Sequence, residues 1–493
     1  MMLLALGASP AQAQLWDARD RFLPVPSIAE QEFMRYGEVV ASCDWDGDGR
    51  ADLAVGMPDY SNDAGAVFFF RMDPQGSPVF VRAVGTVNQE SLGASVACGD
   101  FDGDGDAEVA AGAPEFALGG IEEGRVVLYD WVAGTMVDTG EFRQSLAGVA
   151  GGAEDFDEFG GSLAVGDFDG DGADDLAVGS PGEDVGATDA AGAVTFFYGE
   201  LGVGLVVAGN SIWHKDTTGV VGDPGEGENV GLALAAIRND CDAFDDLAVG
   251  VPGQTVDGVE DAGAVYVVQG SAGGLVHATS FVLDTTSFTQ EGASPPHLSD
   301  RFGSTLASAG AYFPGACGTI AIGAPRREVG GVDGAGALYL RGEGGGSTRY
   351  FTAADFDVAP DPQDNFAESF AFADFNADGR LDLVVGMPGN DPALSNLTGG
   401  VFVGLSNSGA EPDPGNAQLI VPRSTLGLFE FVTDDGSLGE ALVSADFDGD
   451  SVPDLAVGLP TADYGDLTNV GGVQILYGGL FAADFEGGND NEW

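Results

Sequence analysis

Basic residues are scarce in this sequence of 493 residues, which contains 17 lysines and arginines against 79 aspartates and glutamates. The formal net charge is −62, and Lys215 is the only lysine. Nucleic acids and anionic membrane surfaces carry phosphate groups that attract basic proteins and repel acidic ones. We therefore expect neither nucleic acid nor a membrane surface as a partner.

Long apolar runs are absent as well. No segment approaches the roughly 20 apolar residues that a membrane-spanning helix needs, so we expect no membrane span. The first residues, MMLLALGASPAQA, contain a short apolar stretch followed by the small-x-small pattern Ala11-Gln12-Ala13. That pattern is typical of a cleaved secretory signal. It predicts a signal peptide at residues 1–13 and an exported protein, secreted or held at a bacterial cell surface.

Histidine is also rare, and none of the three histidines (His214, His277 and His297) lies in a recognisable catalytic motif. Catalysis needs a convergent acid and base, or a nucleophile beside a base. We therefore do not expect an enzyme. Acidic loops could still hold a pair of catalytic carboxylates, so a secreted hydrolase or lyase acting on carbohydrate or lipid stays open as the alternative.

Glycine and proline, in contrast, are plentiful, at 80 and 23 residues. Their spread along the chain indicates many tight turns, as in an all-β protein of short strands. The chain also repeats itself, with related segments that begin between 56 and 73 residues apart. Five copies are intact: DWDGDGRADLAVGMP from Asp44, DFDGDGDAEVAAGAP from Asp100, DFDGDGADDLAVGSP from Asp167, DFNADGRLDLVVGMP from Asp374 and DFDGDSVPDLAVGLP from Asp446. Two are degenerate, near residues 238–246 and 311–319.

Each repeat predicts four strands. A bulky residue and a small one, such as Tyr36-Gly37, precede the acidic loop, and an apolar run ending in Gly-x-Pro follows it. Two further runs come next, for example AGAVFFF and VFVRAV. Short apolar runs between Gly, Pro and Asp are typical of strands buried on both faces of a sheet. Seven such units predict a seven-bladed β-propeller of four-stranded antiparallel blades.

The propeller is expected to form one domain over residues 14–480, followed by a tail at 481–493. Residues 15–30 precede the first repeat and are left over. We expect them to close the ring by adding an outer strand to the last blade.

The acidic loops predict metal sites. At an effective dielectric constant of 20, two carboxylates about 5 Å apart repel each other by roughly 3 kcal/mol, so converging carboxylates need a cation. Oxygen side chains at loop positions 1, 3, 5 and 9, a carbonyl at position 7 and glycine at position 6 suit calcium better than magnesium. About five ions are expected. The predicted ligands are Asp44, Asp46, Asp48, Arg50 and Asp52 (loop 44–52); Asp100, Asp102, Asp104, Asp106 and Glu108 (loop 100–108); Asp167, Asp169, Asp171, Ala173 and Asp175 (loop 167–175); Asp374, Asn376, Asp378, Arg380 and Asp382 (loop 374–382); and Asp446, Asp448, Asp450, Val452 and Asp454 (loop 446–454).

Two other interpretations of the loops, an EF-hand and a solvated acidic turn, fit less well. An EF-hand needs a bidentate acid at position 12, where these loops have Val55 or Ala111 inside a predicted strand. A solvated acidic turn explains one loop more easily than five in the same register. The aromatic residue at position 2 is expected to be a buried anchor behind the loop.

The combination of bulky-Gly, Asp-x-Asp-x-Asp-Gly-x-x-Asp and apolar-Gly-x-Pro resembles the FG-GAP repeat of the integrin α-subunit N-terminal propeller. The resemblance covers roughly residues 30–480. It implies one calcium ion per intact loop and a propeller that binds extracellular partners on the face opposite the calcium loops.

Four cysteines fit an oxidising compartment. Cys241 and Cys317 lie inside the two degenerate loops, and we hypothesise that a disulfide between them staples blades that lack a metal. Cys43 and Cys98, just ahead of the first two loops, would form the second pair. Crossed pairing and free thiols remain the alternatives.

A small basic group stands out in so acidic a chain. His297, Arg301, Arg326 and Arg327 are expected on one blade, on the face opposite the metal loops. They could form an anion site for a ligand, or they could pair with acids such as Asp300 and Glu328. The sequence thus predicts a secreted, monomeric calcium-binding module for an extracellular protein or glycan, used in adhesion or binding.

Overall fold

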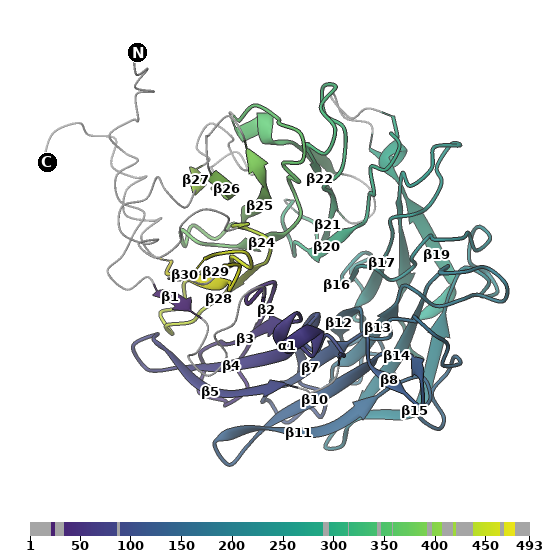
Figure 1. The fold of residues 1–493 in the computed structure, drawn as a ribbon, viewed down its shortest axis with the longest axis horizontal. Helices are drawn as coiled ribbons and strands as arrows, with labels where there is room; N and C mark the ends of the chain where they lie inside the picture. The colour runs from purple at the N-terminus through teal and green to yellow at the C-terminus, as the bar shows by residue number, and fades with distance from the viewer. Residues whose placement is uncertain are drawn as a thin grey trace, which may run out of the picture.

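The protein is a ring of seven four-stranded antiparallel sheets, seen down its shortest axis in Figure 1. This computed structural model describes residues 21–24, 34–85, 89–288, 295–313, 315–342, 347–356, 358–391, 397–406, 418–420, 437–463 and 468–478. The fold is therefore the predicted seven-bladed β-propeller. The predicted signal peptide (1–13) and tail (481–493) lie outside the described residues.

The blades follow the seven sequence repeats in order. Blade 1 consists of β2 (Val39–Cys43), β3 (Asp52–Met57), β4 (Ala66–Met72) and β5 (Pro78–Gly85). Blade 2 consists of β6 (Ser95–Gly99), β7 (Glu108–Ala113), β10 (Arg125–Val132) and β11 (Thr135–Phe142). Blade 3 consists of β12 (Ser162–Gly166), β13 (Asp175–Ser180), β14 (Ala193–Glu200) and β15 (Gly204–Trp213). Blades 4 and 5 consist of β16 (Leu234–Ile237), β17 (Asp246–Val251), β18 (Ala264–Gln269) and β19 (Val276–Leu283); and β20 (Thr305–Ser308), β21 (Thr319–Ala324), β22 (Ala337–Gly342) and β23 (Thr348–Phe351).

Blades 6 and 7 complete the ring. Their strands are β24 (Phe370–Ala373), β25 (Asp382–Asp391), β26 (Leu397–Gly404) and β27 (Gln418–Ile420); and β28 (Leu442–Ala445), β29 (Asp454–Gly458), β30 (Gly472–Leu476) and β1 (Arg21–Pro24). Short elements between strands are α1 (Tyr60–Asp63), the hairpin β8 (Ala117–Leu118) and β9 (Ile121–Glu122), and the 3₁₀ turns η2 (Thr285–Ser287) and η4 (Ala353–Phe356). Among the described residues, no helix is long and apolar enough to cross a bilayer.

The N-terminal strand closes the ring, as predicted for residues 15–30. β1 pairs antiparallel with β30, in the register Phe22 opposite Gln474 and Leu23 opposite Val473. The last blade is thus built from both ends of the described chain. Leu23 is buried and joins the core between blades 7 and 1.

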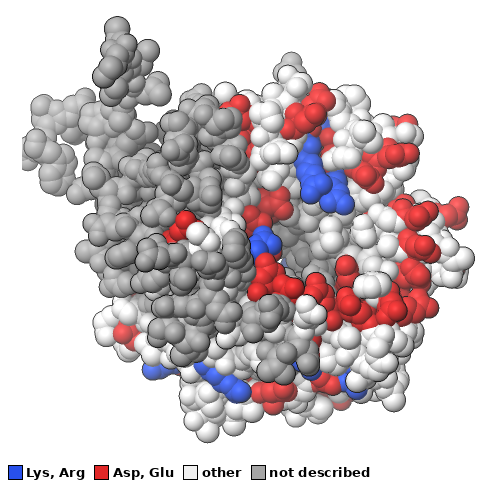
Figure 2. All heavy atoms as spheres, viewed as in Figure 1, with Lys and Arg blue, Asp and Glu red and all other residues white. Residues whose placement is uncertain are grey.

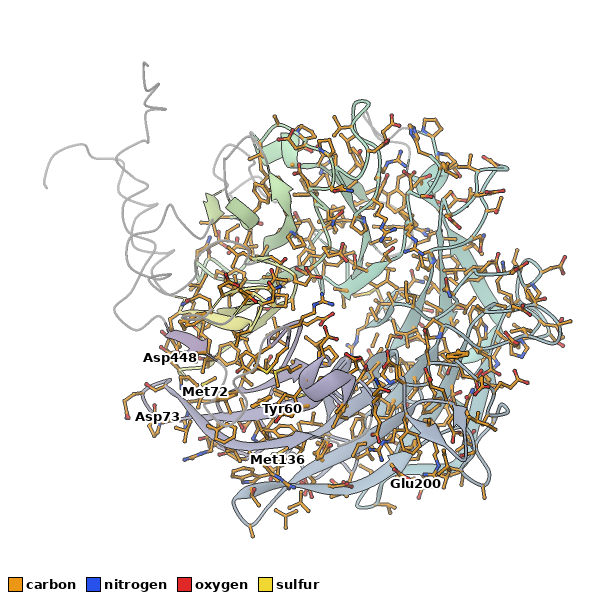
Figure 3. The ribbon with its side chains drawn as sticks, viewed as in Figure 1. Tyr60, Met72, Asp73, Met136, Glu200 and Asp448 are labelled. Carbon is orange, nitrogen blue, oxygen red and sulfur yellow. A yellow bond between two sulfur atoms is a disulfide. The ribbon has the colours of Figure 1, made fainter. Side chains whose placement is uncertain are left out.

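The cores lie between neighbouring blades rather than within one. The first strands of adjacent blades contact each other, as β2 does with β6 and β28, and so they surround the centre of the ring. The second strands, with the sequence pattern Asp-Leu-Ala-Val-Gly, are buried along their whole length. Their side chains pack against both neighbouring blades, which explains why these runs are continuously apolar (Figure 3).

The bulky-Gly pairs join one blade to the next just before each first strand. Tyr36 forms a parallel bridge with Gly471 of blade 7, and Phe159 forms the same bridge with Gly124 of blade 2. Gly37 has φ +91°, and a Cβ there would lie 2.4 Å from the Gly472 carbonyl oxygen. Glycine is therefore required by both the backbone conformation and the close approach of the next blade.

Two disulfides connect blades, in the pairing hypothesised from the sequence. Cys43, at the end of β2, bonds to Cys98 in β6, which joins the first strands of blades 1 and 2. Cys241 bonds to Cys317, which joins the degenerate loops of blades 4 and 5.

Candidate metal centres and the opposite face

The five intact acidic loops lie at the turn between the first and second strands of blades 1, 2, 3, 6 and 7. In four of them, three carboxylates have oxygens within 4.8 Å of one another. The groups are Asp44, Asp46 and Asp48; Asp100, Asp102 and Asp104; Asp167, Asp169 and Asp175; and Asp446, Asp448 and Asp454. The fifth loop has Asn376 at position 3, which offers an amide oxygen in place of a carboxylate. The structure thus brings together most of the predicted ligands at positions 1 and 3.

Positions 5 and 9 differ between loops. Asp48 and Asp104, at position 5, belong to their clusters, whereas Asp171 and Asp450 do not. Asp175 and Asp454, at position 9, belong to theirs, whereas Asp52 and Glu108 do not. The described geometry therefore gives each of these four loops three converging acids rather than four.

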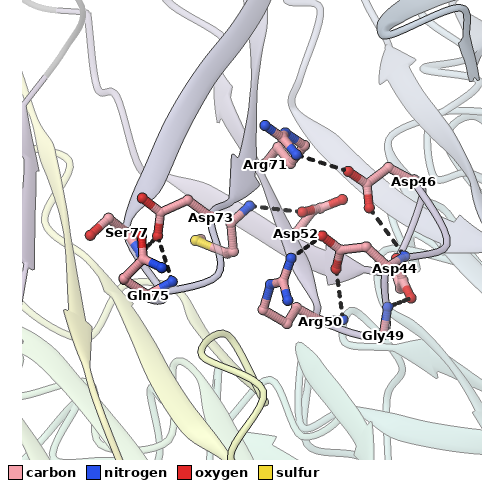
Figure 4. Close-up of polar contacts among 11 residues, drawn as sticks. Asp44, Asp46, Gly49, Arg50, Asp52, Arg71, Asp73, Gln75 and Ser77 are labelled. Atoms are coloured by element: carbon pink, nitrogen blue, oxygen red, sulfur yellow. Dashed lines mark hydrogen bonds and ion pairs between the residues drawn. The ribbon is translucent and has the colours of Figure 1, made fainter.

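Backbone hydrogen bonds curl each loop around its first carboxylate. The Gly49 amide donates to Asp44 Oδ2 at 2.7 Å and the Asp48 amide to Asp44 Oδ1 at 3.1 Å (Figure 4). Gly49 has φ +86°, as expected for position 6, but Gly47 at position 4 is also left-handed, with φ +69°. Glycine at position 4, present in four of the five intact loops, is a second sequence signal for this turn that was not predicted.

The position 2 aromatics are buried anchors, as expected. Trp45, Phe168 and Phe447 are each 0% exposed, and Phe101 and Phe375 are each 1% exposed. They hold the loop against the core from behind, so they are unavailable for stacking on a ligand.

In four of the five loops, the position 9 aspartate ties the loop to a residue in or just after the third strand of its own blade. In blade 3, Asp175 accepts hydrogen bonds from the Phe168 amide at 2.8 Å and from the Gly199 amide, at the end of β14, at 2.9 Å. Burial raises the pKa of Asp175 to about 7, the two amides oppose that shift, and Asp169 and Asp167 add to it. A cation bound among these groups would favour their charged forms.

The degenerate loop of blade 4 keeps this anchor without the full acid set. Asp246 accepts from the Asn239 amide and the Gly270 amide, both at 2.9 Å, just as Asp175 does. Arg238 replaces the position 1 aspartate and pairs with Asp245 at 3.0 Å. The position 9 carboxylate therefore has a structural role that does not depend on a metal.

Arginine at position 7 contributes more than a carbonyl. The Arg50 guanidinium forms an ion pair with Asp48. Arg71, from β4, lies 3.7 Å from Asp46 (Figure 4). In blade 1, side-chain cations thus partly offset the charge of the loop.

The loops of neighbouring blades are joined by a hydrogen bond that sequence analysis did not reveal. The amide of position 8 donates to the position 1 carbonyl of the preceding blade. The bonds are Ala51 to Asp446, Ala107 to Asp44, Asp174 to Asp100 and Asp245 to Asp167, at 2.8 to 3.1 Å. Gly76 of blade 1 also approaches Asp448 of blade 7, which is labelled in Figure 3. The backbone of each of these loops is therefore held directly against the loop of a neighbouring blade.

The opposite face carries a cavity of 910 Å³ beside the predicted basic group. Its lining includes His297, Leu298, Arg326, Glu328 and Asp333. Arg326 is exposed, and His297 Nδ1 lies 3.5 Å from Glu328 Oε2. The surrounding surface is rich in acidic side chains, as Figure 2 shows for one face of the molecule.

The prediction that Arg327 belongs to this ligand face is wrong. Arg327 is 0% exposed, forms an ion pair with the equally buried Asp300, and donates to the Pro295 carbonyl at 3.1 Å. Its charge is needed to compensate a buried acid, which was the competing interpretation. Arg301 is half-buried and is not among the lining residues of the cavity.

Comparison with known proteins supports the repeat assignment. The FG-GAP-like repeat model matches residues 44–111, and the FG-GAP repeat model matches 159–197 and 366–404. The chain is similar to integrin alpha-PS2 of Drosophila melanogaster, at 33% identity over 218 residues, covering 43% of this chain and 14% of that protein. It is also similar to phosphatidylinositol-glycan-specific phospholipase D of Rattus norvegicus, at 38% identity over 108 residues, covering 22% of this chain and 12% of that protein. The chain thus matches about an eighth of the length of these relatives.

Among solved structures, rhamnogalacturonan lyase YesW covers 94% of this chain and 76% of its own, with 13% sequence identity and a TM-score of 0.46. That TM-score is too low to carry an argument about function.

Proposed function

We propose, for a chain that carries FG-GAP repeats and resembles the integrin α propeller, that its acidic loops bind calcium and that the propeller is an extracellular binding module. The observation that carries the proposal is the convergence of three carboxylates within 4.8 Å in each of four loops. Two such charges about 5 Å apart repel each other by roughly 3 kcal/mol at an effective dielectric constant of 20. A divalent cation removes that repulsion.

The chemistry of the loops favours calcium. All side-chain ligands are hard oxygens, and the loops also present backbone carbonyls and open positions for water. A flexible loop with several carboxylates suits the six to eight oxygen ligands of calcium, whereas magnesium demands a stricter octahedron. Five ions are proposed, one for each intact loop, and the loop of blade 6 would use the Asn376 amide oxygen.

The calcium proposal is tested by counting ions and measuring stability. Plasma mass spectrometry of protein dialysed against calcium should find several ions per chain. Chelation with EDTA should lower the melting temperature, because calcium binds the folded loops and not the unfolded chain. An unchanged melting temperature together with an absence of bound ions would contradict the proposal.

The cavity on the opposite face is the proposed binding site for an extracellular protein or glycan. Its size suits a small ligand or a protruding loop, and exposed Arg326 offers a cation in an otherwise acidic surface. Two inter-blade disulfides support an oxidising, extracellular location.

The binding site is tested on a glycan array and on immobilised extracellular matrix proteins. Arg326→Glu should abolish any binding seen with the natural chain, whereas Val132→Ala, at an exposed residue of β10 outside the cavity, should leave it intact. We propose binding without turnover, so release of reducing ends or fatty acid from the bound ligand would favour the enzyme alternative instead.

A further inference from the structure

A buried acid recurs two residues before the bulky-Gly pair, on the face opposite the acidic loops. It is present in five consecutive blades, as Glu90, Asp157, Glu228, Asp300 and Asp364. Each of these side chains is no more than 8% exposed. A buried carboxylate is stable in its charged form only with a compensating partner, because it has lost its contact with water.

Three of these acids receive a cation from the chain itself. Glu90 pairs with Arg125 at 2.6 Å, and Asp300 pairs with Arg327. In blade 4, Lys215 Nζ lies 2.7 Å from both carboxylate oxygens of Glu228 and 3.5 Å from Gln254 Oε1. The only lysine of the whole sequence is therefore placed at this site.

Blade 3 has the same site with different residues. The segment 142–160, FRQSLAGVAGGAEDFDEFG, aligns without gaps on 213–231, WHKDTTGVVGDPGEGENVG. In that alignment Gln144 stands in the place of Lys215 and Asp157 in the place of Glu228. When the alignment is extended with the same offset, Glu183 stands in the place of Gln254. The blade 3 site thus holds one more carboxylate than that of blade 4 and has lost the ammonium group.

The blade 3 residues are buried together. Gln144 is 3% exposed, Asp157 is 1% exposed and Glu183 is 6% exposed, and the Gln144 amide donates to Glu183 Oε2. Asp157 Oδ1 and Gln144 Oε1 are both buried and have no hydrogen-bond partner. Both acceptors therefore belong to residues that act on Glu183, and neither is satisfied within the described part of the chain.

No basic side chain serves this site within the described part of the chain, where neither carboxylate has a lysine, arginine or histidine nitrogen within 4.0 Å. The neighbouring Arg143 pairs instead with Glu141. The other charged groups that act on Glu183, Glu154 and Asp184, are acids and add to the negative potential.

We propose that a divalent hard cation, calcium, binds between Asp157, Glu183 and Gln144, at the position that the Lys215 ammonium occupies in the next blade. Two carboxylates and an amide oxygen form a hard, doubly negative ligand set, which matches the charge of the ion. Gln144 follows the last strand of blade 2, whereas Asp157 and Glu183 flank strands of blade 3. The ion therefore clamps two blades on the face opposite the acidic loops and is separate from the loop sites.

The test replaces the ion with a built-in ammonium group. Gln144→Lys should bind one calcium ion fewer per chain than the natural protein, counted by plasma mass spectrometry after equilibrium dialysis. It should also melt at a higher temperature than the natural protein in EDTA. Thr139→Lys, at an exposed position of β11, makes the same change of charge and should leave the ion count unchanged.

A second variant keeps the proposal testable if Gln144→Lys fails to fold. Asp157→Asn combined with Glu183→Gln removes both carboxylates, and it should also bind one ion fewer without melting earlier in EDTA. Equal ion counts in Gln144→Lys, in the double variant and in the natural protein would overturn the proposal. Each variant's calcium count is compared with that of the natural protein. If the acidic loops bind no calcium, all counts fall together, and the one-ion difference still tests the Gln144 site.

Discussion

Asp175 and Asp246 offer a matched pair of substitutions that separates the metal contribution of an acidic loop from its structural contribution. Both side chains are 0% exposed, and both accept two backbone hydrogen bonds of nearly equal length. Asp175 converges with two further carboxylates, whereas Asp246 lies in the degenerate loop, outside the acid clusters found among the described residues. Asparagine preserves the shape of the side chain and removes its charge in both cases.

The magnitude follows from linkage between binding and folding. One ion that binds only the folded chain stabilises it by about 2.7 kcal/mol when calcium is present at about 100 times its dissociation constant. Asp175→Asn should therefore reduce the calcium-dependent part of the free energy of unfolding by about this amount. Asp246→Asn should leave that part unchanged, although both variants lose a charge-assisted hydrogen bond worth about 1.5 to 3 kcal/mol.

The assay is urea unfolding of both variants and the natural chain, in saturating calcium and in EDTA, followed by tryptophan fluorescence. In EDTA the two variants should be destabilised by similar amounts. In calcium, the free energy of unfolding of Asp175→Asn should be lower than that of Asp246→Asn. If the calcium-dependent change were the same for both variants, the position 9 acid would not report on a metal and the argument from the loops would fail.

Three further outcomes are expected. Replacing Cys241 and Cys317 with serine opens a link between residues 76 apart and should cost about 4 kcal/mol in urea unfolding; an unchanged midpoint would contradict the staple hypothesis. Burial, and then the Glu440 carboxylate, raise the pKa of Glu368 to about 7, so the natural chain should lose up to about 3 kcal/mol of stability as pH rises from about 4.5 to 7. Glu368→Gln should flatten that part of the melting-temperature profile in constant calcium, and an identical profile would refute the assignment. Leu23→Ala should cost about 2 to 5 kcal/mol by thermal unfolding if β1 truly closes the ring, whereas a negligible change would indicate that the ring holds without it.

Much of the fold follows from the sequence, because a propeller repeats its local signals. Local sequence patterns predict the buried second strands and the left-handed glycines at position 6. The segment left over before the first repeat likewise predicts β1. The cysteine pairing also followed, since equivalent places in adjacent repeats lie near each other.

The features that sequence analysis missed depend on contacts between repeats. The Asp174 amide donates to the Asp100 carbonyl in the preceding blade. A backbone hydrogen bond does not depend on the side chains, so the residue types could not predict it. For Arg327 the sequence left two interpretations open, a ligand contact or pairing with Asp300, and only the burial of both side chains decides for the pair. The sequence aligns Gln144 with Lys215, but only the structure shows that Gln144 and Asp157 are buried with unsatisfied oxygens.

The pairing of β1 with β30 has a consequence for biosynthesis. The register sets Arg21 opposite Ile475, so β1 cannot find its place until β30, at the far end of the ring, has left the ribosome. Until then β30 has an open edge, and exposed strand edges invite pairing with other molecules. Nascent or truncated chains are therefore the species most prone to aggregate, and a chaperone that shields this edge would raise the yield of closed rings.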